Sequence, residues 1–114
     1  MNRTPDVIVL GAGIIGCAVA YELARRGARV RVIDGREVGR GATQASAGVL
    51  APCMEGDNRR VLAELGVRSL HQYDEWVARV VEDSGMAVQY VRKGALGDAI
   101  GEGSLDRLEE IAAT

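Results

Sequence analysis

The chain has 114 residues and a formal net charge of −2, with 47% hydrophobic and 26% charged residues. This length matches one ordinary domain, and the composition is typical of a soluble globular protein. It excludes collagen-like, coiled-coil and strongly disordered chains, and the mild acidity disfavours nucleic acid or an anionic membrane as a partner.

The targeting and metal-binding signals are weak. Cys17 and Cys53 have no spacing typical of a disulfide framework or a metal site. The apolar stretch that contains Cys17 resembles a lipoprotein cleavage box, but Asp6 spoils a positively charged leader and the glycines in the stretch have a better explanation below. No run of 18 or more apolar residues occurs. We therefore expect a cytoplasmic protein with no transmembrane helix and no metal.

The first 34 residues predict a βαβ unit. Residues 6–10, Asp-Val-Ile-Val-Leu, form a short apolar run rich in β-branched residues, which indicates a strand buried on both faces. Helix-forming residues follow from Ile14 to Arg26, and Gly27 predicts the end of that helix. Strand character returns over residues 29–34, so two parallel strands joined by a right-handed crossover are expected.

A loop and a long helix are predicted next. Residues 35–57 are rich in glycine and other small residues, and a loop of this length in a compact domain usually has a function. Asn58 is placed to cap a helix that runs to about Asp83 and ends at Ser84-Gly85. His71, the single histidine, is expected to be structural or exposed on this helix. The apolar stripe of the helix comprises Leu62, Leu65, Ser69, Tyr73, Trp76, Val77 and Val80.

Two short strands and a last helix complete the prediction. Residues 88–91 and 95–100, joined through Lys93-Gly94, are typical of a hairpin. Ser104 then starts a helix that continues toward Thr114. Within the chain we find only two strands of a doubly wound sheet, so the expected fold class is α/β, a Rossmann-like unit with an incomplete sheet.

A dinucleotide fingerprint lies where the first strand ends and the helix begins. The segment Gly11-Ala12-Gly13-Ile14-Ile15-Gly16 has the required glycines, and Asp34 ends the second strand 18 residues after Gly16. Gly11 is expected to permit the tight turn, Gly13 to admit the pyrophosphate and Gly16 to let helix and strand pack closely. Helix N–H groups would hold the phosphates, and Asp34 would accept hydrogen bonds from a ribose. The fingerprint alone does not separate FAD from NAD.

A second motif is carried by residues 38–52, Val-Gly-Arg-Gly-Ala-Thr-Gln-Ala-Ser-Ala-Gly-Val-Leu-Ala-Pro. Together with residues 6–34 it resembles the D-amino-acid oxidase superfamily of FAD enzymes, and most closely the glycine oxidases of thiamine biosynthesis. Small residues suit this segment, because a backbone that passes close to a flat ring has no room for bulky side chains.

The resemblance implies a set of FAD-contacting positions. Ile14 and Ile15 would lie in the phosphate turn with Gly11, Gly13 and Gly16; Asp34 and Gly35 would lie at the adenosine ribose, Ala42 and Thr43 near the pyrophosphate, and Ala47, Gly48 and Val49 beside the isoalloxazine ring. Position 49 departs from the family pattern, where a methionine is common, and this weakens any inference about the substrate.

The resemblance also implies oxidation of an amino acid or amine by hydride transfer to the flavin. Family members hold the substrate carboxylate with an arginine and a tyrosine from the later part of a longer chain, so no catalytic residue is assigned here. We expect residues 1–114 to form the N-terminal part of a FAD-binding domain, inactive alone: 1–34 as the fingerprint, 35–57 as the FAD loop, and 58–114 as helix, hairpin and helix leading to a substrate domain. The chain would then be part of a larger or split enzyme, or of a homo-oligomer.

Two other functions stay open at this point. One is an NAD-binding dehydrogenase domain, although such a domain normally continues after Asp34 with a helix and a strand rather than this loop. The other is an inert remnant or interaction module that binds a partner through an open edge strand.

Overall fold

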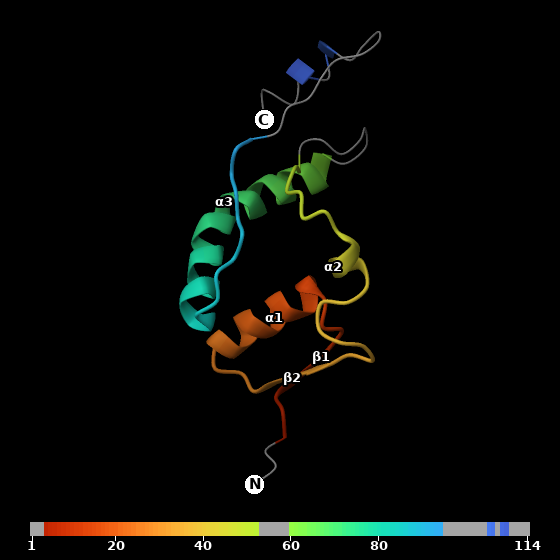
Figure 1. Ribbon diagram of the computed structural model, residues 1–114, viewed down its shortest axis with the longest axis vertical. Coiled ribbons are helices and arrows are strands. Elements are labelled where there is room, and N and C mark those ends of the chain that lie inside the picture. Colours follow the sequence, from red (N-terminus) through yellow and green to blue (C-terminus); the bar gives the residue numbers. More distant parts are fainter. Residues whose placement is uncertain (1–3, 53–59, 95–104, 107, 110–114) are drawn as a thin grey trace. The chain divides into compact units, whose positions relative to one another are not determined.

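The computed structural model describes residues 4–52, 60–94, 105–106 and 108–109 (Figure 1). The chain divides into two compact units, Met1–Val49 and Leu50–Thr114, and each is treated by itself below. In the described ranges, no helix combines the length and the apolar character that crossing a membrane requires.

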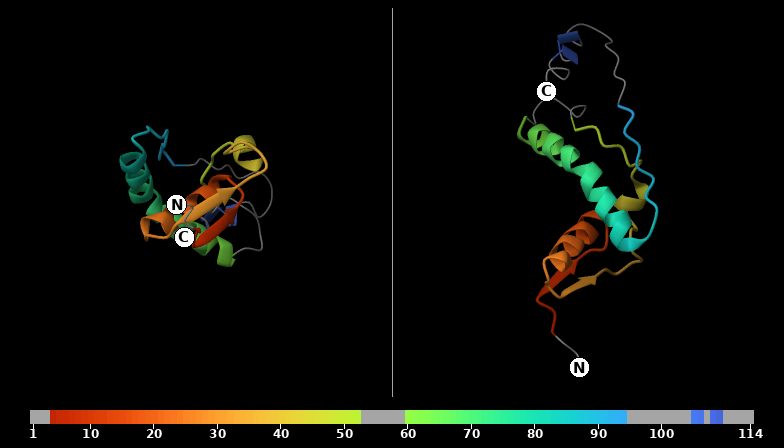
Figure 2. Two further views of the ribbon diagram at one scale, coloured as in Figure 1. Left: turned by 90° about the horizontal axis from the view of Figure 1, so that it is seen from below. Right: turned by 90° about the vertical axis from the view of Figure 1, so that its left-hand side faces the viewer.

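The first unit contains the predicted βαβ arrangement. Strand β1 (Val7–Leu10) leads to helix α1 (Ile14–Arg25) and then to strand β2 (Val30–Ile33). The two strands are parallel and in register from the pair Val7/Val30 to the pair Leu10/Ile33, and α1 packs against both (Figure 2). The prediction of a parallel βαβ unit is therefore confirmed.

Gly27 ends α1, as the sequence predicts. Its φ of +88° lies in the left-handed region, which favours glycine. The Gly27 N–H donates to the Ala24 carbonyl at 2.9 Å, and the Ala28 N–H donates to the Leu23 carbonyl at 3.1 Å. This pair of bonds is the Schellman motif, which satisfies two carbonyls at the helix end and turns the chain into β2.

An ion pair joins the starts of the two strands. The Asp6 N–H donates to the Arg29 carbonyl at 2.8 Å, while Asp6 Oδ2 accepts from the Arg29 backbone N–H at 2.9 Å and from Nε at 3.0 Å. Asp6 Oδ1 also pairs with the guanidinium Nη2. These bonds fix the strand register, and the hydrogen bonds from Arg29 lower the pKa of Asp6 to about 2.

The expected burial of β1 on both faces is wrong. Exposure alternates along the strand, with Ile8 55% and Leu10 80% exposed. The reason is that α1 packs on one face, and no other element of the described first unit covers the opposite one. Among the described hydrophobic residues only Ala12, at 4% exposure, is buried.

A short helix interrupts the predicted loop. Helix α2 (Ala42–Ala45) follows Gly41, whose φ is +82°. The sequence does not predict α2, because a single helical turn carries no periodic pattern.

The second unit is built on helix α3 (Arg60–Ser84). The predicted cap at Asn58 lies outside the described residues. Of the predicted apolar stripe, Leu62, Leu65 and Ser69 are exposed, whereas Tyr73, Trp76, Val77 and Val80 are half-buried. His71 is exposed on α3, as allowed by the sequence analysis.

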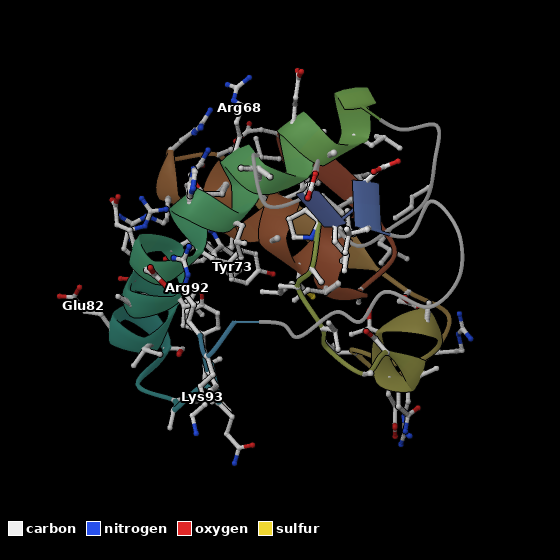
Figure 3. The ribbon with its side chains drawn as sticks, turned by 90° about the horizontal axis from the view of Figure 1, so that it is seen from above. Arg68, Tyr73, Glu82, Arg92 and Lys93 are labelled. Carbon is white, nitrogen blue, oxygen red and sulfur yellow. The ribbon has the colours of Figure 1, made fainter. Side chains whose placement is uncertain are left out.

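The predicted strand at 88–91 is wrong, because residues 86–94 have no regular secondary structure. Side chains hold this segment to α3 instead. Arg92 Nη1 donates to Asp74 Oδ2 at 2.6 Å, and the rings of Tyr90 and Tyr73 lie 5.8 Å apart. Figure 3 shows Arg92 next to Tyr73 of α3. The predicted strand 95–100 lies outside the described residues; residues 105–106 and 108–109 are helical, and the rest of the last helix is also outside.

The Asp6–Arg29 pair predicts a pH dependence of stability. The folded-state pKa of Asp6, about 2, is below its ordinary 3.8. The stabilisation is therefore fully present above about pH 4 and is lost as the pH falls toward 2. Urea unfolding of the wild type and of Asp6→Asn, followed by circular dichroism from pH 2 to 6, should give midpoints that converge below pH 4. A difference that stays constant from pH 2 to 6 would contradict this role, and Arg29→Gln should lose the same pH dependence.

Candidate functional site

The fingerprint turn begins where β1 ends. Gly11 has a φ of +103°, a conformation that side-chain-bearing residues rarely adopt, and its N–H donates to the Ile33 carbonyl at 2.8 Å. This bond extends the strand pairing by one step and places the turn next to the residue that follows β2, Asp34.

Asp34 is held by two backbone N–H groups. Oδ2 accepts from Ala12 at 2.7 Å and Oδ1 accepts from Arg36 at 2.8 Å. These bonds, the one from Ala12 first, lower the pKa of the Asp34 carboxyl. The carboxylate is therefore ionised at neutral pH, is exposed, and keeps further lone pairs as acceptors. It is chemically suited to accept hydrogen bonds from two neighbouring hydroxyl groups.

Gly16 lies at the closest approach of α1 to the turn. A Cβ atom built there would lie 1.9 Å from the Gly11 carbonyl oxygen and 3.4 Å from Val9 Cγ1. Backbone atoms cannot move away as a flexible side chain can, so only glycine fits. This geometry agrees with the packing role that the sequence predicts for the third glycine.

Thr43 brings the second motif to the start of α1. Its Oγ1 accepts a hydrogen bond from the Ile14 N–H at 2.9 Å. Gly13, the residue before α1, provides no side-chain cap, and a Cβ on Gly13 would lie only 3.0 Å from Thr43 Oγ1. Thr43 thus caps the helix from 29 positions away. Because the oxygen accepts this bond, the hydroxyl hydrogen remains able to donate to another group.

Two further contacts converge on Ala12 and were missed from the sequence. The Gly39 N–H donates to the Ala12 carbonyl at 2.8 Å, and Cys17 Sγ lies 3.5 Å from the same oxygen. Gly39 has a φ of +78°, so a glycine is favoured where the loop returns to the turn. The sequence shows only that Gly39 is a glycine in a loop, and this does not identify the backbone group that it contacts.

The structure brings only part of the predicted set together. Gly11, Gly13, Gly16, Asp34 and Thr43 are joined through the contacts above, and Ile14 and Ile15 are exposed at the start of α1. In residues 4–52, no hydrogen bond links the fingerprint turn to the other predicted positions, which are Gly35, Ala42, Ala47, Gly48 and Val49. All five are exposed. The segment after α2 is turned by Gly48, whose N–H donates to Ser46 Oγ at 3.1 Å.

The described residues contain no cluster of three or more His, Cys, Asp or Glu side chains able to hold a metal ion. The polar groups of this site are one carboxylate, one hydroxyl and backbone N–H groups. Such donors and acceptors suit a nucleotide with ribose hydroxyls and phosphates.

Comparison with known protein families gives the class. The family described as "DAO: FAD dependent oxidoreductase" matches residues 6–114. The chain belongs to this family of FAD-dependent oxidoreductases, which confirms the resemblance to the D-amino-acid oxidase superfamily.

Individual relatives agree with that assignment. The chain is 35% identical over 105 residues to the uncharacterized oxidoreductase YurR of Bacillus subtilis (strain 168), covering 92% of this chain and 28% of YurR. It is 33% identical over 113 residues to a glycine oxidase of Bacillus licheniformis, covering 99% of this chain and 31% of that protein. A bifunctional protein ThiO/ThiG of Synechocystis is 36% identical over 97 residues, 84% of this chain and 15% of that protein. The chain therefore spans less than a third of the length of these relatives.

The Thr43–Ile14 bond is testable in the chain without cofactor. Thr43→Val keeps the side-chain shape but removes the acceptor, so the Ile14 amide should exchange its hydrogen with solvent roughly fivefold faster, the equivalent of one hydrogen bond. Thr43→Ser keeps the hydroxyl and is the matched control, with exchange close to the wild type. Hydrogen exchange followed by NMR measures both. Equal rates in Thr43→Val and Thr43→Ser would show that Thr43 does not cap α1.

Proposed function

We propose that this chain is the FAD-binding segment of an oxidoreductase that oxidises an amino acid or an amine, as a glycine oxidase does. The observation that carries the proposal is the Ala12–Asp34 hydrogen bond of 2.7 Å. It joins the phosphate turn of the fingerprint to the carboxylate suited to a ribose. The hydrogen bond between Thr43 and Ile14 holds the second motif against the same turn.

The residues at the turn fit the adenosine and phosphate parts of FAD. The N-terminus of α1 carries a partial positive charge and N–H groups, so it can hold phosphate oxygens without a lysine or arginine. Glycine at position 13 leaves room for Thr43 at the start of α1, since a Cβ there would lie 3.0 Å from Thr43 Oγ1. The ionised Asp34 accepts from ribose hydroxyls and repels a 2′-phosphate. In this proposal Gly11, Ile15 and Gly16 complete the phosphate turn, with Gly35 at the ribose.

The segment around α2 favours FAD over NAD. In this proposal Ala42 and Thr43 lie near the pyrophosphate, and Ala47, Gly48 and Val49 lie beside the isoalloxazine ring. Their small or exposed side chains leave the backbone accessible to a flat ring. A nicotinamide-binding domain has no need of this segment.

The chemistry is divided between the cofactor and the chain. When bound, FAD would supply the ring that accepts a hydride from the substrate carbon; the iminium ion left behind loses a proton to give an imine, which water hydrolyses. The residues of this chain bind and orient: Asp34 holds the ribose, the turn holds the phosphates, and Thr43 fixes the loop against α1. We assign no catalytic side chain within this chain, and the substrate and the electron acceptor are not specified by these residues.

Titration of the chain with FAD, followed by flavin fluorescence and by the visible spectrum, tests the proposal. We expect saturable binding of FAD and much weaker binding of NAD. Asp34→Ala should weaken FAD binding by at least about tenfold, because it removes charge-assisted hydrogen bonds to the ribose.

Two controls make the outcome specific. Asp74→Ala removes an exposed carboxylate from the second unit and should leave FAD binding unchanged. Tighter binding of NAD than of FAD, or equal FAD affinity in Asp34→Ala and the wild type, would refute the proposed site.

A further inference from the structure

Arg36 lies across the loop between β2 and α2. A Cβ built on Gly41 would lie 3.1 Å from Nη2, 3.2 Å from Nη1 and 3.3 Å from Cζ of Arg36. If the edge of the guanidinium faced this Cβ position, Cζ would be clearly farther from the Cβ than the two nitrogens are. The three similar distances instead mean that the flat face of the guanidinium rests largely against Gly41.

This packing makes the opposite face of the guanidinium the one that a ligand could contact. Arg36 is exposed overall although one face is covered by Gly41. Glycine suits the contact, since a Cβ at position 41 would crowd the guanidinium at 3.1–3.3 Å and make the Arg36 side chain shift. With a φ of +82°, position 41 also favours glycine for its backbone conformation.

Arg36 is also next to the proposed ribose acceptor. Its backbone N–H donates to Asp34 Oδ1 at 2.8 Å. In an adenine dinucleotide, the base is attached at C1′ of the ribose and the phosphate is carried through C4′, at the other end of the ring. With the ribose at Asp34 and the phosphates at the start of α1, the base extends away from the phosphate turn. Arg36 follows Asp34 by two positions and is therefore a candidate to contact the base.

We propose that Arg36 is a specificity-determining residue for the adenine of the bound dinucleotide, with its free guanidinium face stacked on the purine ring. The inference rests on the proposed nucleotide site but adds a residue and a ligand group that the fingerprint does not include. Arginine suits this role because its planar, delocalised cation stacks on aromatic faces, whereas the compact ammonium group of lysine offers no such plane.

The test compares ADP with UDP, which share the ribose and diphosphate and differ in the base. Isothermal titration gives the affinity ratio of ADP to UDP in the wild type, in Arg36→Gln and in Arg36→Lys. Stacking at an exposed site predicts that both variants lower this ratio by about two- to fivefold and weaken FAD to a similar extent. Arg40→Gln is the matched control: it removes an exposed arginine of the same loop, which pairs with Glu37 at 2.7 Å, and should keep the wild-type ratio.

The remaining outcomes decide against the role of Arg36, against the FAD function, or against both. An unchanged ratio in both Arg36 variants would show that Arg36 does not contact the base. A wild-type ratio in Arg36→Lys alone would assign the effect to charge rather than to the planar face. A chain that binds ADP but not FAD would refute the FAD function, and its affinity ratio of ADP to UDP would still test the role of Arg36. A chain that binds neither nucleotide nor FAD would contradict both proposals.

Discussion

The hydrogen bond from the Ala12 N–H to Asp34 is the contact on which the first unit depends. It ties the end of β2 to the turn after β1 over 22 positions of sequence. The Ala12 carbonyl accepts from Gly39, so the same peptide group also holds the loop that leads to α2. Through this one residue, the two strands, the fingerprint turn and the second motif are kept in one arrangement.

Hydrogen bonds and an ion pair hold this arrangement together, because few of the described residues are buried. Ala12 is the one buried hydrophobic residue among those described, and β1 and β2 form a two-stranded sheet with one face of β1 open. Parallel strands are normally covered on both faces, and pairs of strands are marginal by themselves. The Asp6–Arg29 pair, the Schellman turn at Gly27 and the Thr43 cap therefore matter more here than they would in a fully packed domain.

Local patterns made the βαβ unit and the end of α1 predictable. The apolar run of β1, the three glycines and Gly27 each act over a few residues, and the structure gives physical reasons for Gly11 and Gly16. Burial of β1 was not predictable, because it depends on which elements pack against the strand. The strand predicted at 88–91 failed for a similar reason: a strand needs a pairing partner, and here Tyr90 and Arg92 bind α3 by their side chains. Contacts such as Arg36 on Gly41 depend on loop geometry and leave no sequence pattern.

The most direct measurement of the central claim is an NMR titration of the labelled chain with FAD. If the Ala12–Asp34 contact joins the phosphate turn and the ribose acceptor in one cofactor site, the largest changes in amide chemical shift will fall on residues 11–16, 34–36 and 42–43 together, at one saturating concentration. Asp34→Ala should move the changes at all three segments together to an FAD concentration at least about tenfold higher. Changes confined to one of these segments, or concentrated in α3, would contradict the account.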